Sequence, residues 1–567
     1  MRPTKFIPLC LKAFTLSLLI VFSAATLAAQ ETCVKDDFNC YLRNANADIA
    51  KDPTYGFYVY VRAGIYARMK NYAAALADYD LALSMSWGGW GMEHGRWMVY
   101  RARAEMNSAR GEYDAAIRDY SSLIAMGGGS GDYWGRGNAY LNKGEPQSAL
   151  NDYNTTERLM REKGETIGYG LYFQRGRANL GLKKWDQTIS DFTLSIGLNA
   201  KESASYYNRA LAFINKEDQN SALADLSQAI IVDVNNASAY FERGRIYLDR
   251  KSYESAIADY SKYIALNSSE PAGYANRALA FEGKGDIDAA IADHSSALKI
   301  MPGYKFSLGQ RAWLHRKKKD FALAIADYDT LEKLDPSSET PFTSRINVYL
   351  DAGDKSSVER EYVRFLAFNP LHGHHLRGHF YFNEKRYSDA AADFTECYKL
   401  DKVFGDCLLD RAQTYSSAKN YDLALADIEA SINMKQSVNR ANMIKADVYL
   451  DQKRYADSLA ICDDLIKNNV AGFSPRTRRA NVFREQGEFA KAQAEYETAI
   501  ASGEQYGYTY YNRALLLIKM NKRPEAIADL EKALEISPNY DEAKRDLEKL
   551  KSSTPVTSNT PMKPNQR

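Results

Sequence analysis

The chain has almost no net charge and lacks the motifs that identify most enzymes. Its 74 Lys and Arg residues nearly balance 72 Asp and Glu residues, so the charge favours neither nucleic acid nor an anionic membrane as a partner. No nucleophile elbow, paired-carboxylate constellation, phosphate-binding loop or zinc-protease motif occurs. The sequence therefore predicts a protein that is not an enzyme and that uses no cofactor.

Long apolar runs are also scarce, and the one that stands out lies near the N-terminus. Positive residues at Arg2, Lys5 and Lys12 accompany the run AFTLSLLIVF (13–22), and small residues follow in SAATLAA (23–29). This order is typical of a secretory signal peptide over residues 1–29, and the run is short for a bilayer span. We expect a periplasmic or secreted chain that does not insert into the membrane after cleavage. A retained anchor and a eukaryotic secretory lumen are the alternatives.

Cysteines are few, and five of the six lie beyond residue 29. Cys33 and Cys40 are close together in a lead-in over residues 30–55, where a disulfide would close a small loop in an oxidising compartment. Cys397 and Cys407 are a second candidate pair. Cys462 is left over, and its place in the chain predicts a buried thiol.

What the sequence does contain is a repeat of 34 residues. The unit ASAYFERGRIYLDRKSYESAIADYSKYIALNSSE begins at Ala237, and further units begin at Pro271 and Lys305. Apolar residues recur with helical spacing over two segments of about a dozen residues, separated by a break. Small residues fall at the eighth and twentieth positions, which are Gly244 and Ala256 in this unit. The pattern predicts two antiparallel helices that approach closely at these positions.

This unit resembles the tetratricopeptide repeat, a helix–turn–helix unit of the same length. The resemblance covers residues 56–540 in fourteen units, which begin at Gly56, Trp97, Ser130, Tyr169, Ser203, Ala237, Pro271, Lys305, Glu339, Leu371, Gly405, Asn439, Phe473 and Gly507. It implies an all-α fold, a right-handed α-solenoid in which neighbouring units stack into a superhelix. Residues 541–552 are then a polar capping helix, and residues 553–567 are a disordered tail.

An arginine occupies the seventh position of thirteen units, and the twenty-third position is usually an aspartate. We expect structural pairs within each unit, because helices that meet at positions eight and twenty also bring seven near twenty-three. In the unit that begins at Asn439, Lys445 and Ile461 replace both residues, which favours pairing within the unit. The predicted pairs include Arg209–Asp225, Arg243–Asp259 and Arg277–Asp293.

The resemblance also implies that positions two, five, nine, twelve and thirteen of the first helices line a concave groove. Side chains at these positions are partly apolar and partly charged, which suits an extended peptide or a partner's helix. The candidate partner-binding residues are Tyr207, Leu211, Phe241, Arg245, Trp313, Arg316, Lys317, His375, His379, Arg440 and Asp447. The predicted function is a monomeric extracytoplasmic scaffold for protein–protein interaction, in envelope assembly or secretion. The alternative is a chaperone-like holdase for exported clients.

Two clusters support a further alternative, the capture of metal or glycan. In PLHGHHLRGHF (370–380), His372, His375 and His379 fall on the predicted groove side of one helix. His375 and His379 are four residues apart and are candidates to share a metal ion, although no carboxylate or thiol is evident as a further ligand. A proton-sensitive contact and an ordinary polar surface are the other interpretations. Tryptophans near two glycine-rich inserts form either a sugar-stacking surface or plugs between units: Trp87, Trp90, Trp97 and Trp134.

Overall fold

The helix pairs of this protein are all built around the same tight turn. The computed structural model describes residues 33–402, 407–468, 474–503 and 506–552, so the predicted signal peptide (1–29) and tail (553–567) lie outside the described residues. At the fifteenth position of every repeat the backbone has a positive φ, for example +58° at Lys251 and +92° at Gly285. One left-handed residue ends the first helix and turns the chain back into the second.

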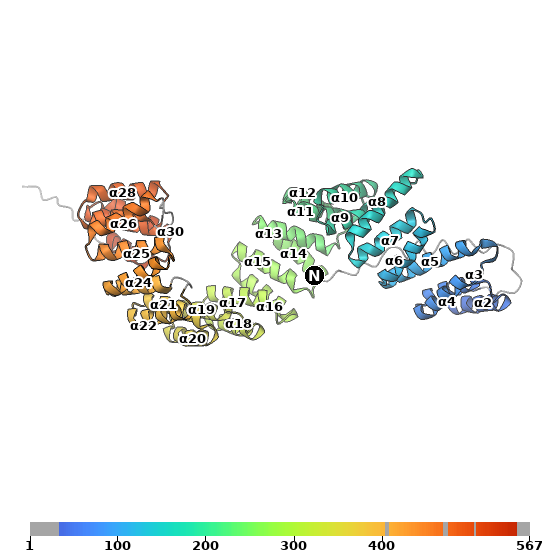
Figure 1. Cartoon of the computed structure of the whole chain (residues 1–567), viewed down its shortest axis with the longest axis horizontal. Coiled ribbons are helices and arrows are strands. Elements are labelled where there is room, and N and C mark those ends of the chain that lie inside the picture. Colours follow the sequence, from blue (N-terminus) through green and yellow to red (C-terminus); the bar gives the residue numbers. More distant parts are fainter. Residues whose placement is uncertain (1–32, 403–406, 469–473, 504–505, 553–567) are drawn as a thin grey trace, which may run out of the picture. The chain divides into compact units, whose positions relative to one another are not determined.

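The helices divide between two units, residues 1–307 and 308–567, and each is described by itself. The first unit starts with α2 (Phe38–Lys51) and continues as consecutive helix pairs (Figure 1). A short 3₁₀ helix, η2 (Gly88–Trp90), separates the first two pairs. The pairs are α3 (Gly56–Arg68) and α4 (Tyr72–Ser84), α5 (Met92–Arg110) and α6 (Tyr113–Ala125), α7 (Ser130–Lys143) and α8 (Pro146–Glu162), α9 (Tyr169–Gly181) and α10 (Trp185–Leu198), α11 (Ser203–Asn215) and α12 (Gln219–Val232), α13 (Ala237–Asp249) and α14 (Tyr253–Leu266), and α15 (Pro271–Lys284) and α16 (Ile287–Ile300).

The second unit repeats this arrangement and ends in a single helix, α31 (Asp541–Ser552), over the residues expected to form a cap. Its first helix, α17, begins just before the boundary between the units. The pairs are α17 (Lys305–Lys317) and α18 (Phe321–Leu334), α19 (Thr340–Asp351) and α20 (Lys355–Phe368), α21 (Pro370–Asn383) and α22 (Tyr387–Leu400), α23 (Cys407–Ser417) and α24 (Tyr421–Asn433), α25 (Val438–Asp451) and α26 (Tyr455–Lys467), α27 (Pro475–Glu485) and α28 (Phe489–Ala501), and α29 (Gly507–Lys519) and α30 (Arg523–Ile536). This all-helical architecture confirms the predicted α-solenoid. Within the described ranges, none of these helices is long and apolar enough to cross a membrane.

The core of the pair α13–α14 combines small residues with one large side chain from the second helix. Ala256 is completely buried, and a Cβ atom on Gly244 would lie 3.1 Å from the ring of Tyr260. Tyr260 is itself completely buried, at the twenty-fourth position of its repeat. The eighth position of this repeat must therefore stay small, because the Tyr260 ring occupies the space between the two helices.

The arginine at position seven meets the acid at position twenty-three, as the repeat pattern predicts. Arg209 Nε donates to Asp225 Oδ2 and its Nη2 donates to Oδ1, both at 2.7 Å. Equivalent two-pronged pairs join Arg243 to Asp259 and Arg277 to Asp293. Since the acid is buried in each case, the arginine balances a charge inside the solenoid wall.

The same arginines also reach into the preceding repeat, which the sequence interpretation missed. Arg209 Nη1 donates to Thr193 Oγ1 at 2.9 Å, so one guanidinium on α11 joins α12 to α10. In the repeat where the acid is Ile461, Lys445 pairs with Glu429 of the repeat before it. The inference that pairing is confined to one unit is therefore too narrow, because the side chain at position seven bridges neighbouring units.

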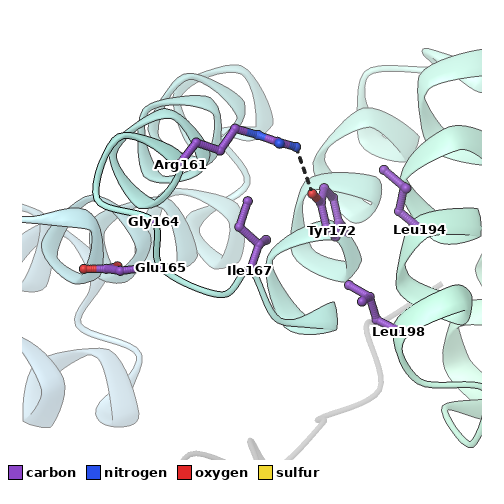
Figure 2. A pocket seen from close by; sticks show the side chains of 7 residues that line it. All are labelled: Arg161, Gly164, Glu165, Ile167, Tyr172, Leu194 and Leu198. Atoms are coloured by element: carbon purple, nitrogen blue, oxygen red, sulfur yellow. Dashed lines mark hydrogen bonds between the residues drawn. The ribbon is translucent and has the colours of Figure 1, made fainter.

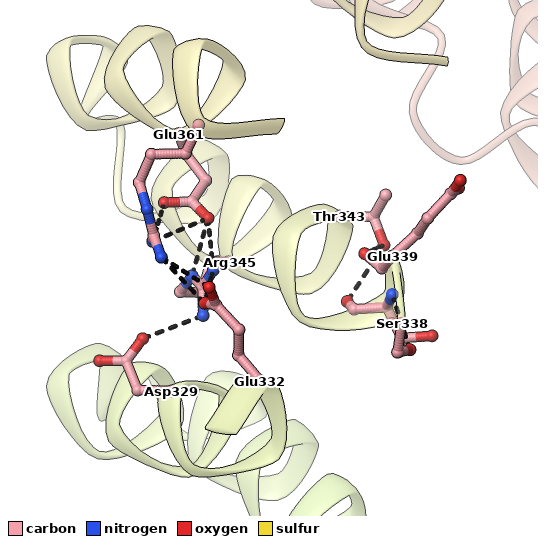
Figure 3. A network of polar contacts seen from close by, with 9 residues as sticks. Asp329, Glu332, Ser338, Glu339, Thr343, Arg345 and Glu361 are labelled. Atoms are coloured by element: carbon pink, nitrogen blue, oxygen red, sulfur yellow. Dashed lines mark hydrogen bonds and ion pairs between the residues drawn. The ribbon is translucent and has the colours of Figure 1, made fainter. Parts of the chain in front are cut away.

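The repeat that begins at Glu339 carries an extended network of this kind (Figure 3). Arg345 is 1% exposed and contacts three acids at once: Glu361 on α20, and Asp329 and Glu332 on α18. Arg364 pairs with both Glu332 and Glu361. Two cations and three acids thus share one cluster, in which each nitrogen of the buried Arg345 guanidinium donates to a carboxylate.

Candidate partner-binding groove and histidine cluster

In the first unit, the candidate groove residues are largely occupied by contacts within the solenoid. The ring of Phe241 packs against Tyr260 and Tyr263, with ring centroids 5.7 and 4.9 Å apart. Arg245 pairs with Glu242 on its own helix at 2.9 Å. Tyr207 and Leu211 are half-buried. Burial, followed by the charge of Glu242, raises the pKa of Tyr207 to about 12, so its hydroxyl stays protonated at neutral pH.

In the second unit, the charged candidates are tied together from one repeat to the next. Arg316 Nε donates to Asp351 Oδ2 at 2.6 Å, which links α17 to α19. Asp447 accepts from Arg478 at 2.9 Å, which links α25 to α27. These charges therefore brace successive first helices, and a partner would meet them as neutral pairs.

Trp313 differs from these paired residues because its indole is exposed. The side chain lies at position nine of α17, where 38% of the residue is accessible to solvent. The ammonium of Lys317 lies 4.8 Å from the ring centroid, one helical turn away. An exposed tryptophan next to a cation offers a partner a large apolar surface and a positive charge.

The four histidines of α21 turn to three different neighbours. His372 Nδ1 lies 2.7 Å from Glu339 Oε2, in the preceding repeat. His374 Nδ1 lies 2.7 Å from Asp393 Oδ1, the acid that also pairs with Arg377 on the same helix. Only His375 and His379 turn toward the following repeat. Of the three histidines predicted to share a face, His372 therefore contacts the preceding repeat and the other two contact the following one.

His375 and His379 meet Asp410, a carboxylate on α23 that the sequence interpretation did not foresee. Their Nε2 atoms are 3.2 Å apart, and they lie 3.1 and 3.3 Å, respectively, from the same oxygen, Asp410 Oδ2. Arg440 on α25 donates to the other oxygen, Oδ1. Three consecutive first helices therefore contribute to one cluster, and the structure brings together the candidates His375, His379 and Arg440.

The environment of Asp410 keeps its carboxylate ionised. Burial alone would raise its pKa, but contacts with both histidines and with Arg440 outweigh burial and hold the pKa well below its usual range. Asp410 is 4% exposed, whereas the side chain of His379 is 44% exposed. The cluster thus has a buried anionic base and an open side at His379.

One of the two described disulfides lies next to the histidine cluster. Disulfides join Cys33 to Cys40 and Cys397 to Cys407. The second one connects the end of α22 to the first turn of α23, three residues before Asp410. Cys462 is a buried free cysteine. The Cys397–Cys407 bridge therefore anchors the helix that supplies the carboxylate.

The described tryptophan side chains of the cluster, those of Trp87, Trp97 and Trp134, do not share one exposed surface. Trp87 is 1% exposed, its Nε1 donates to the Ala82 carbonyl at 3.0 Å, and Gly95 approaches it so closely that a Cβ there would lie 1.9 Å from the indole. Trp97 is half-buried beneath the guanidinium of Arg101, at 3.9 Å. Trp134 is exposed. Trp87 is thus a plug between repeats and is closed to a sugar ring.

A shallow depression of about 510 Å³ lies where α8 passes into α9 (Figure 2). Ile167, Tyr172, Leu194 and Leu198 form its apolar part, and Arg161 donates to the Tyr172 hydroxyl at 3.4 Å. The guanidinium of Arg161 is already engaged by Glu157. The depression contains none of the predicted site residues, and the guanidinium that lines it is already paired.

Comparison with known proteins identifies the repeated unit. Family models described as tetratricopeptide repeat match residues 207–271, 371–404, 409–469 and 507–540. None of the curated proteins matches the chain.

Several solved structures are similar to parts of it. Yeast Tom70 is 15% identical over 74% of this chain and 95% of its own, with a TM-score of 0.36. The C-terminal part of a TPR repeat-containing protein from Cytophaga hutchinsonii is 19% identical over 43% of this chain and 98% of its own, with a TM-score of 0.39. YrrB, a TPR protein with an unusual peptide-binding site, is 16% identical over 31% of this chain and 89% of its own, with a TM-score of 0.28. From the matched family models, this chain contains tetratricopeptide repeats.

Proposed function

We propose that the chain is a non-enzymatic scaffold that binds a segment of another protein along the first helices of its second unit. The observation that carries the proposal is the exposed indole of Trp313 at a groove position, beside the Lys317 ammonium. Leu350, on the next first helix, is also exposed. A fitting segment carries an apolar anchor and a nearby acidic side chain, because these complement the indole and the ammonium.

We further propose that this binding takes place outside the cytoplasm, in envelope assembly or secretion, with the chain acting as a monomer. Two disulfides support an oxidising compartment, since structural disulfides are rare in the cytosol. The N-terminal sequence supports the same location through its resemblance to a signal peptide. Alkylation of free thiols in intact cells, before and after reduction, tests the location. A chain whose four paired cysteines all react without reductant would contradict it.

The binding surface is tested by photo-crosslinking from defined positions. A benzophenone amino acid at position 313 is expected to capture a distinct partner in cells, because the side chain there faces the proposed segment. The matched control is position 323 on α18, where Leu323 is exposed on the second helix of the same repeat. Equal products from both positions, or none from either, would refute binding along the first helices.

The same experiment separates a dedicated scaffold from a holdase. A scaffold gives one main adduct at position 313, and Trp313→Ala weakens binding of that partner by about 30-fold, which corresponds to a hot spot of about 2 kcal/mol. A holdase instead gives a broad range of adducts, and Trp313→Ala changes their recovery little, because many weak contacts share the binding.

A further inference from the structure

We propose that His375, His379 and Asp410 form a binding site for a divalent first-row transition metal ion, with Zn²⁺ as the ion to test. This inference goes beyond the proposed scaffold function and does not depend on it. Two imidazoles and one carboxylate are a ligand set found in protein sites for such ions, which accept nitrogen and oxygen donors together.

The distances between the three donor atoms fit one central ion. They form a nearly equilateral triangle with edges of 3.1, 3.2 and 3.3 Å. With donors about 2.1 Å from the ion, octahedral angles separate neighbouring donors by about 3.0 Å and tetrahedral angles by about 3.4 Å. The observed edges fall between these limits, so the spacing of the donors suits one central ion.

Hydrogen bonding alone satisfies this triangle poorly. Each neutral imidazole can carry one proton on Nε2, and Asp410 Oδ2 accepts from both nitrogens only if both are protonated there. Two N–H groups would then face each other across the 3.2 Å edge between the histidines. An ion removes this conflict, because both imidazoles present lone pairs from Nε2 and keep their protons on Nδ1.

The surroundings hold the donors in place. The histidines are four residues apart on α21, so they project from the same face of the helix. Arg440 engages Asp410 Oδ1 and leaves Oδ2 directed toward the histidines, which is how outer partners orient metal ligands. The centroid of the buried Phe394 ring lies 5.1 Å from that of His379 and 6.3 Å from that of His375. This ring closes one side of the site with an apolar surface.

One side of the site remains open. Asp410 is buried, the side chain of His375 is 21% exposed and that of His379 is 44% exposed, so solvent reaches the cluster past His379. A three-ligand site with an open side leaves a coordination position for water. The ion would thus tie the repeat that carries α21 to the repeat that carries α23, close to the Cys397–Cys407 disulfide.

The test measures Zn²⁺ uptake by the full, tag-free chain after treatment with a chelator. Calorimetry or equilibrium dialysis is expected to show saturation at one equivalent. The double variant His375→Ala/His379→Ala should lose this binding. Asp410→Asn should weaken it by at least the ~10–100-fold that loss of an outer partner costs. The matched control is His372→Ala, which removes a histidine from the same helix but outside the triangle and should leave affinity unchanged.

Co²⁺ provides a second readout that identifies the donors. Binding at this site should give weak visible bands without a sulfur-to-metal charge-transfer band, because none of the three ligands is a thiolate; Cys462 is buried and the other described cysteines form disulfides. Circular dichroism in the presence of chelator checks that each variant is folded. No uptake by the parent chain, retained uptake by the folded double variant, an equal loss in His372→Ala, or a thiolate band would each overturn the proposal.

Discussion

Removing the acid of a single arginine–aspartate pair should destabilise its repeat more than removing both partners together. Asp225 is 6% exposed and accepts hydrogen bonds from Nε and Nη2 of Arg209. The side chain of Arg209 is 18% exposed. In Asp225→Ala, the arginine keeps its contact with Thr193 but loses its counter-charge. Breaking a fully buried pair costs about 3–5 kcal/mol, and an exposed pair contributes about 0–1 kcal/mol. Because the guanidinium is partly exposed, we expect the low end of the buried range, about 3 kcal/mol.

The double variant Arg209→Met/Asp225→Leu should stay within about 1 kcal/mol of the parent chain. It removes both charges and fills the space with apolar side chains, an exchange that is often neutral in buried pairs. The repeat with Lys445 and Ile461 shows that the architecture accepts an apolar residue in place of the acid. The difference between the single and double variants isolates the cost of the unpaired arginine.

Hydrogen exchange measured by mass spectrometry is the appropriate assay, because a long repeat array does not unfold in one step. A loss of about 3 kcal/mol makes amide exchange about a hundredfold faster. The faster exchange should be confined to α11, α12 and their neighbours, and α29 and α30 serve as a control within the same molecule. The reasoning is refuted if Asp225→Ala changes exchange less than threefold, or if the double variant is as destabilised as the single one.

Two further predictions concern the turn and the free thiol. Lys251 and Gly285 both have a positive φ, which glycine alone adopts without strain. In denaturant titrations, Lys251→Gly should therefore stabilise the chain by about 0.5–1 kcal/mol, and Gly285→Ala should destabilise it by about 1 kcal/mol. Equal effects of both changes would contradict this. Burial raises the pKa of Cys462 from 9.0 to about 12. At pH 8, alkylation of the Cys462 thiol should therefore be about a thousandfold slower in the folded chain than in the unfolded chain. Peptide mapping measures both rates. Rapid labelling of native protein at pH 8 would exclude a protected thiol.

The repeat period was sufficient to predict the fold from sequence. Once the units are aligned, positions seven and twenty-three define the arginine–acid pairs, and each predicted pair appears as a contact between two helices of one repeat. The turn at position fifteen was harder to characterise, because Lys251 has no intrinsic preference for a left-handed conformation. Only the alignment with glycines such as Gly285 reveals it.

The candidate site was only partly predictable, because its members belong to different repeats. Asp410 lies 35 residues after His375, at position six of the next unit, and position six was not among the groove positions considered. The residue at position six varies from unit to unit, for example Asn208, Glu242 and Arg478, so the sequence pattern does not single out Asp410. Its contact with the histidines required the stacking geometry of neighbouring units.

The repeat that holds Lys445 depends on its predecessor in a way that the other repeats do not. Lys445 pairs with Glu429 in the preceding repeat, and Ile461 on its own second helix offers it no opposite charge. The other thirteen repeats hold the counter-charge of position seven within themselves, so removal of the preceding repeat would leave only Lys445 without its carboxylate partner.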